Sequence, residues 1–187
     1  TNIVTYLDRL VLYPLLGSDA VATFYTASFF GKAVSVIAMP VAGVLLGYYA
    51  QKDYSMTLKK YWLINALCGG ALLVFCIFTV FFGEAITGIL FPKLIQDASP
   101  YIFIANMASA IAAIIQLVQA ASLKYAKTYW QIVMQVIYLG VYFCLGMILM
   151  QENGLMGFCV AFLIANIARL VMLLTICQIS IKNKIMV

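Results

Sequence analysis

Long apolar stretches separated by short polar connections occupy nearly the whole chain. This pattern predicts membrane-spanning helices, because a hydrocarbon core of about 30 Å requires about 20 helical residues to cross it. The predicted spans cover residues 1–16, 20–50, 61–82, 101–123, 128–150 and 155–180. The first is slightly short, and we expect the chain to be a piece of a longer polypeptide entered partway through a helix. The sequence therefore predicts an all-α membrane protein built as a six-transmembrane-helix bundle.

Two interruptions shape this prediction. Gly17, Ser18 and Asp19 combine a helix breaker with a capping side chain, so they separate the first two helices. The segment 85–98 is apolar but too short to cross a bilayer, and Pro92 interrupts it. We expect 85–98 to form a short interfacial helix that lies near the membrane surface.

Composition strengthens the membrane assignment and excludes other classes. Of 187 residues, 66% are hydrophobic and 9% charged, whereas soluble domains carry roughly a quarter charged residues. The net charge of +5 comes from basic residues scattered among the short connections, so nucleic acid is not predicted as a partner. Lys and Arg stay on the cytoplasmic side of membranes. The second and fourth connections and the C-terminus are therefore predicted to be cytoplasmic.

Soluble-enzyme chemistry finds no support in the residues. The five cysteines all fall within apolar runs without a CxxC pair, and the chain has no histidine to complete a metal site. There is also no Ser/His/Asp set and no Gly-rich phosphate loop. The cysteines are interpreted as small buried hydrophobes. We predict neither an enzyme nor a bound metal or cofactor.

The most informative polar residue is Lys32, twelve residues into the predicted helix 20–50. An ionisable group near the bilayer centre costs at least ~2.5–3.5 kcal/mol, so its position calls for an explanation. Tyr25, Ser28 and Ser35 recur with Lys32 at helical spacing, so they share one face of the helix. That face is predicted to point at water or protein.

Other predicted helices also carry polar side chains, and together they predict a central aqueous cavity. Asn106 lies on the fourth helix, Gln135 on the fifth, Arg169 near the middle of the sixth, and Asp8 with Arg9 on the first. Three simpler interpretations stay open. Amides in membrane helices often hydrogen-bond between helices, and Asp8 can pair with Arg9 or with a neighbouring helix. Arg169 can also extend toward the cytoplasmic face.

The order of several short motifs resembles that of a known transporter group. The stretches 6–12 (YLDRLVL), 15–18 (LLGS) and 22–27 resemble the seventh and eighth helices of polysaccharide and O-antigen flippases. The segments 86–92 (ITGILFP) and 154–158 (GLMGF) are similar to later parts of the same proteins. These flippases belong to the multidrug/oligosaccharidyl-lipid/polysaccharide exporter superfamily.

The resemblance implies a MATE-like transporter of twelve helices, of which this chain is the C-terminal half and an N-terminal six-helix half is missing. Such flippases move an undecaprenyl-diphosphate-linked oligosaccharide across the inner membrane by alternating access, among membrane lipids, driven by an ion gradient or the membrane potential. Arg9 falls on the family's Asp-Arg step, whereas Lys32 and Arg169 are assigned to the cavity from their depth alone. Asp8 is the candidate for ion coupling.

Three rival functions remain at this stage. A multidrug cation antiporter of the same superfamily should carry acidic cavity residues, whereas the deep charged groups here are mainly basic. A membrane-embedded transferase or polysaccharide polymerase should present catalytic acids or histidines on loops, and the loops here are short. In an assembly or scaffold subunit, the polar stripes would be contacts between helices in a dry interior.

Overall fold

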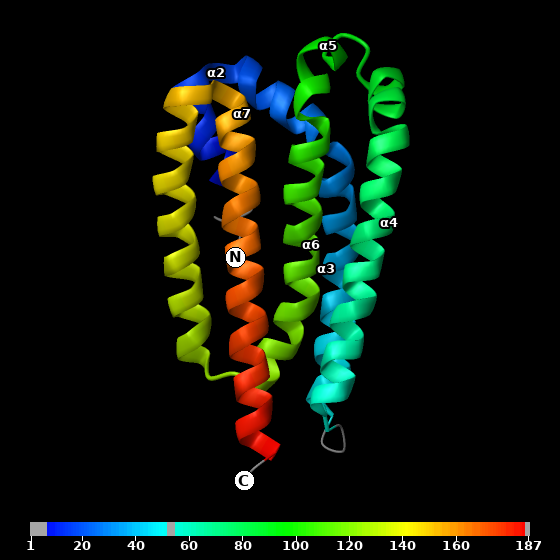
Figure 1. Ribbon diagram of the computed structural model, residues 1–187, viewed down its shortest axis with the longest axis vertical. Helices are drawn as coiled ribbons and strands as arrows, with labels where there is room; N and C mark the ends of the chain where they lie inside the picture. Colours follow the sequence, from blue (N-terminus) through cyan, green and yellow to red (C-terminus); the bar gives the residue numbers. More distant parts are fainter. Residues whose placement is uncertain (1–6, 52–54, 186–187) are drawn as a thin grey trace.

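The structure is a computed structural model that describes residues 7–51 and 55–185, and within these ranges it is built of helices and turns without a strand (Figure 1). In chain order the helices are α2 (Leu7–Ala27), α3 (Phe29–Ala50), α4 (Leu58–Leu90), α5 (Ile95–Ala98), the 3₁₀ turn η1 (Ser99–Tyr101), α6 (Ile102–Tyr125) and α7 (Thr128–Ile185). The predicted all-α class is confirmed.

Four helical segments in the described residues are long and apolar enough to cross a membrane: Phe29–Ala50, Leu58–Leu90, Ile95–Tyr125 and Thr128–Lys182. The last of these reverses direction at Asn153 and Gly154, so its two halves run side by side (Figure 1). Gly154 has φ +54°, a left-handed conformation that suits glycine. The halves match the predicted spans 128–150 and 155–180. The membrane-helical character is thus present, but the predicted number of six spans is not reproduced.

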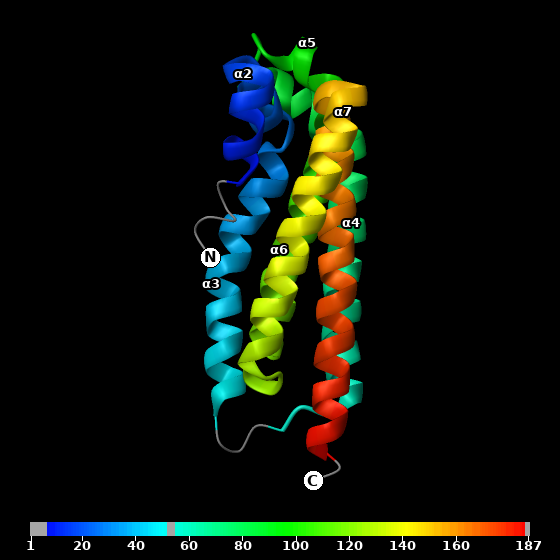
Figure 2. The same ribbon diagram turned by 90° about the vertical axis from the view of Figure 1, so that its left-hand side faces the viewer.

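The predicted helix 20–50 is wrong in its extent, because the helix is interrupted at Ser28. Residues before the break belong to α2, which bends again at Gly17 (φ +81°) and folds over one end of the bundle (Figure 2). The Ser28 hydroxyl donates to the Phe24 carbonyl at 2.7 Å, and both residues are buried. The predicted span 1–16 contributes only the first half of α2, and residues 1–6 lie outside the described residues.

The predicted interfacial helix 85–98 is also wrong. Residues 85–90 form the last turns of α4, the chain turns after Phe91, and α5 has only four residues. The helix continues through Gly83 because that residue packs closely against α6: a Cβ there would lie 3.3 Å from Ile102. The Thr87 hydroxyl donates to the Gly83 carbonyl, and both residues are buried. Packing against α6 therefore stabilises the helical conformation at Gly83 and Glu84, beyond the predicted end of the span 61–82.

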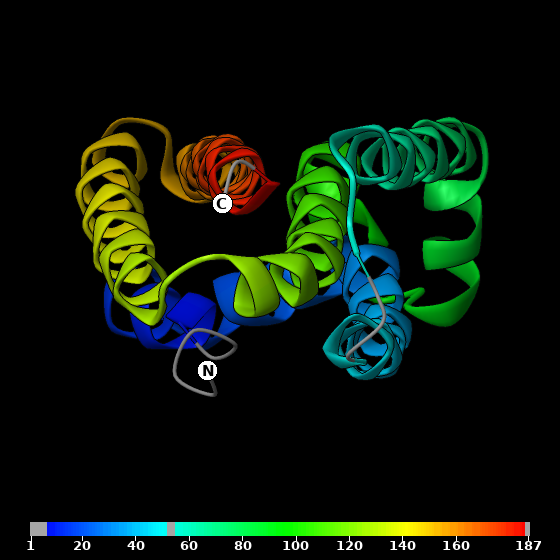
Figure 3. The same ribbon diagram turned by 90° about the horizontal axis from the view of Figure 1, so that it is seen from below.

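Helix α6 is the centre of the bundle, with α3 and α4 on one side and the two halves of α7 on the other (Figure 3). Small residues allow this close packing. Buried alanines line α6, and Gly31 of α3 meets it so closely that a Cβ would lie 2.5 Å from the Ser109 Cβ. Without a strong hydrophobic force between helices in lipid, such close contacts hold the bundle together.

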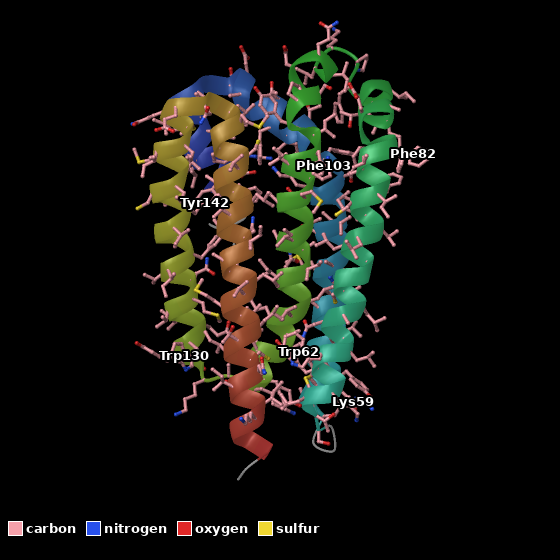
Figure 4. All side chains as sticks on the ribbon, in the orientation of Figure 1. Lys59, Trp62, Phe82, Phe103, Trp130 and Tyr142 are labelled. Carbon is pink, nitrogen blue, oxygen red and sulfur yellow. The ribbon has the colours of Figure 1, made fainter. Side chains whose placement is uncertain are left out.

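The two ends of the bundle differ in charge. The lower end in Figure 1 carries the α6–α7 link, the start of α4 and the end of α7. Its described charged residues are all basic: Lys59, Lys60, Lys124, Lys127 and Lys182. The opposite, upper end carries Asp19, Glu84, Asp97 and Glu152 together with Lys93. Trp62, Trp130 and Lys59 lie near the lower end (Figure 4), as expected for side chains at a membrane–water interface.

Candidate functional site

The first group of charged residues joins the start of α2 to the start of α3. The Lys32 Nζ lies 2.6 Å from the Asp8 Oδ2, and the two side chains are 25% and 10% exposed. The same ammonium stands 4.0 Å from the centroid of the Tyr25 ring and 4.9 Å from that of Phe24. Asp8 therefore pairs across helices, one of the two arrangements that the sequence leaves open. We call these residues, together with Arg9, the upper cluster.

Arg9 lies on the exposed side of the upper cluster. Its guanidinium carbon is 4.9 Å from the Tyr25 ring centroid, so this ring contacts two cations. Cation–ring contacts of this kind contribute about 0.5–1 kcal/mol at exposed sites. The upper cluster thus holds two basic groups and one carboxylate, with Arg9 and the 42% exposed Tyr25 on its outer side.

Lys32 lies at the start of a helix and not twelve residues into one. Because the helix breaks at Ser28, Lys32 lies in the first turn of α3, and its backbone N–H donates to the Ser28 carbonyl. Its charge is held inside the bundle by Asp8, not by the length of the helix on either side. Removing one partner of a buried ion pair leaves an uncompensated charge, which is strongly destabilising.

Ser28 and Asn106, two of the predicted cavity residues, both lie at the helix break and are fully buried. The Asn106 side chain accepts from the Gly31 N–H at 2.7 Å and donates to the Ala27 carbonyl at 2.7 Å. It thereby supplies partners to backbone groups on both sides of the break. The geometry gives these residues a structural role, and contact with a substrate stays a prediction.

A second group of polar residues lies between α6 and the two halves of α7. Arg169 donates from Nη2 to Gln119 Oε1 at 3.4 Å, and its guanidinium carbon stands 4.8 Å from the Tyr138 ring centroid. A narrow pocket with room for a water-sized group opens here, lined by Gln119, Gln131, Met134, Gln135, Arg169 and Leu173. We call it the Arg169 pocket.

The two groups are connected by one face of the first half of α7. Gln131, Gln135, Tyr138 and Tyr142 recur at spacings of four, three and four, which places them on one helix face. At 1.5 Å per residue this face extends about 16 Å. It runs from beside Trp130 near the lower end toward Tyr142 in the upper half (Figure 4). At the upper end of this face the Asp8 carboxylate interacts electrostatically with Tyr138 and Tyr142.

Several buried polar atoms have no hydrogen-bond partner among the protein groups that the structure describes. Gln135 Nε2 and Tyr142 Oη lie on this face of α7, Asn166 Oδ1 belongs to the second half of α7, and Ser109 Oγ lies on α6 where Gly31 of α3 packs. An unpaired buried polar group costs about 1–3 kcal/mol, so each needs a partner from outside these helices or a reason to stay unpaired. The face of α7 that runs from the Arg169 pocket to the upper cluster therefore carries polar groups that packing between the described helices does not satisfy. We call this face the polar path.

The sequence identified the members of both groups but not their partners. It treated Lys32 as a cavity cation and did not predict the pairing with Asp8, although opposite charges on neighbouring apolar helices are a usable signal. It placed Gln135 on the fifth helix and Arg169 on the sixth without connecting them. The described residues hold no group of His, Cys, Asp and Glu side chains suited to a metal ion.

Comparison of the chain with protein-family models, with curated proteins and with solved structures found no match.

Proposed function

We propose that this chain is part of a membrane transporter that flips a lipid-linked oligosaccharide across the cytoplasmic membrane by alternating access. The observation that carries the proposal is the polar path from the Arg169 pocket to the upper cluster, inside a bundle whose helices are otherwise apolar. Ionisable side chains within membrane helices are rare and mark substrate or ion pathways. The resemblance to polysaccharide flippases supports the same reading.

In this proposal the cations Arg9, Lys32 and Arg169 meet the diphosphate or acidic sugars of the substrate, while Tyr25 and Gln135 supply ring and amide contacts. The lipid tail stays in the bilayer. Rocking of this bundle against an N-terminal half exposes the substrate to each side in turn, as in other transporters built of paired halves. The basic lower end faces the cytoplasm, in keeping with the positive-inside rule, which puts the C-terminus there.

Asp8 is the candidate for ion coupling. A proton or a metal cation that binds its carboxylate would release Lys32 from the 2.6 Å pair and make that ammonium available to an anionic substrate. Binding of the ion and binding of the substrate would thus be linked through the Asp8 side chain. It also weighs against the rival multidrug cation antiporter, because a carboxylate already held by Lys32 is a poor binding site for an organic cation.

The proposal is tested in the full-length protein by Lys32→Ala, with Lys127→Ala as the matched control. Lys127 is an exposed lysine outside the polar path. We expect the Lys32 variant to abolish surface polysaccharide even when export is normalised to the amount of folded protein in the membrane, and the control to export normally. Normal export by the Lys32 variant would overturn the proposal.

A charge exchange separates substrate contact from mere stability. In the double variant Asp8→Lys, Lys32→Asp the pair can still form with its charges reversed. If Lys32 serves only to neutralise Asp8, the exchange restores export. If the ammonium at position 32 meets the substrate, export stays lost although the protein folds, which is the result the proposal requires.

A further inference from the structure

We infer that the Arg169 pocket is the anion-binding site of the bundle, and that it takes an anionic oxygen of a phosphate or carboxylate group. This inference deepens the proposed function. It rests on that proposal only for the identity of the molecule that supplies the anion. Among the three basic residues assigned to binding, Arg169 is the one whose surroundings in the structure fit this role.

Arg169 has no carboxylate partner in the described part of the chain, whereas Lys32 has Asp8 at 2.6 Å. The contacts of Arg169 are the side-chain oxygen of Gln119 and the Tyr138 side chain, which leave its positive charge uncompensated. A partly buried cation without a counter-charge favours an anion as its ligand.

The guanidinium of Arg169 has five N–H donors, more than its partners use. Its hydrogen bond to Gln119 is long, at 3.4 Å, and Tyr138 is its other side-chain partner. Gln135 also lines the pocket, and its buried Nε2 has no acceptor among the described groups. Two residues with unused donors, from the two halves of α7, therefore line one small space. An oxygen with a negative charge is the ligand that such donors prefer.

The Arg169 pocket begins close to the lower end of the bundle, because its lining residue Gln131 directly follows Trp130, which lies near that end (Figure 4). The described charged residues at that end are lysines, so the local field attracts anions toward the pocket. The pocket admits only a water-sized group, so a single oxygen of a phosphate or carboxylate fits it, whereas a sugar ring does not.

Binding is measured by calorimetry on the purified full-length protein with two probes. One is inorganic pyrophosphate added to protein in detergent, and the other is undecaprenyl diphosphate in phosphatidylcholine nanodiscs. We expect saturable binding that Arg169→Gln weakens about tenfold or more, because it removes charge-assisted hydrogen bonds. Arg169→Lys should retain part of the affinity, and the exposed control Lys127→Gln all of it. Binding of the lipid probe alone would identify a lipid head group as the source, and binding of both a diphosphate in general.

Gln135→Leu provides a second variant in case Arg169→Gln does not fold. Since Gln135 Nε2 has no partner in the described ranges 7–51 and 55–185, its removal should leave the melting temperature unchanged and still weaken binding severalfold. Unchanged affinity in both variants, or no saturable binding of either probe to the wild type, overturns the inference. If Arg169→Gln loses anion binding but still exports polysaccharide, the site stands and the proposed function fails. If neither probe binds while Lys32→Ala abolishes export, the proposed function stands and the site fails.

Discussion

Replacing Gly31 by alanine tests the contact between α3 and α6 that positions Lys32. A Cβ at this position would lie 2.5 Å from the Ser109 Cβ and 2.6 Å from the Asn106 carbonyl oxygen. Carbon atoms pack at about 3.5–4.0 Å, so α3 has to move away from α6 by about 1 Å. Both neighbours belong to α6, one of them a backbone atom, and a rotamer change cannot relieve the clash.

The magnitude follows from two effects. Overpacking of a tight contact costs about 1–3 kcal/mol. The same movement would stretch the 2.7 Å bond from the Gly31 N–H to Asn106 Oδ1 to about 3.7 Å, which is beyond hydrogen-bonding distance. The loss of a buried bond adds about 1–3 kcal/mol. Together these effects should make Gly31→Ala destabilise the protein by about 2–6 kcal/mol, equivalent to a fall in melting temperature on the order of 10 °C.

The assay is thermal unfolding in detergent, monitored by the reaction of a fluorogenic maleimide with Cys159 and Cys177, which are fully buried in the folded bundle. The other three cysteines are replaced by alanine, because Cys144 is exposed and Cys68 and Cys76 are partly exposed, contrary to the interpretation of all five as buried. Gly43→Ala is the matched control, because it lies on the same helix and a Cβ there meets nothing within 4 Å. It should leave stability unchanged or slightly improved, since alanine favours the helix. Equal melting temperatures for Gly31→Ala and Gly43→Ala would refute the close contact.

Three further predictions test the ion pair, the lower end and the orientation. In a double-mutant cycle measured by thermal unfolding, Asp8→Asn and Lys32→Gln should each destabilise the protein by about 2–4 kcal/mol, because each single change leaves one charge without its partner. The double variant should lose clearly less than the sum of the two, and additive losses would contradict the pairing. Lys124→Ala should lower the free energy of unfolding by about 1–2 kcal/mol, since its Nζ binds carbonyls at the end of α3, whereas the exposed Lys127→Ala should change it by less than about 0.5 kcal/mol. In intact cells and a cysteine-free background, a membrane-impermeant maleimide should label Asp97→Cys but not Lys127→Cys; the reverse pattern would invert the orientation.

The sequence by itself determined the features that depend on the summed transfer energy of a segment. Apolar length predicted the membrane-spanning character of the helices, and the separation of the spans 128–150 and 155–180 predicted the turn between the halves of α7. The polar residues worth attention were also recognisable, because Asp8, Lys32 and Arg169 are conspicuous in apolar surroundings. These conclusions needed no knowledge of which helix lies beside which.

Tertiary structure decided where helices break and which polar residues meet. Hydropathy predicted one helix over 20–50, but the chain turns at Ser28, where Asn106, 79 residues from Ala27 along the chain, binds the backbone on both sides. The same packing gave Lys32 its partner Asp8 and left Arg169 among amides. Pairing energies of this kind arise between segments that are distant along the chain. They appear only once α6 lies between α3 and α7, and no local pattern of residues contains them.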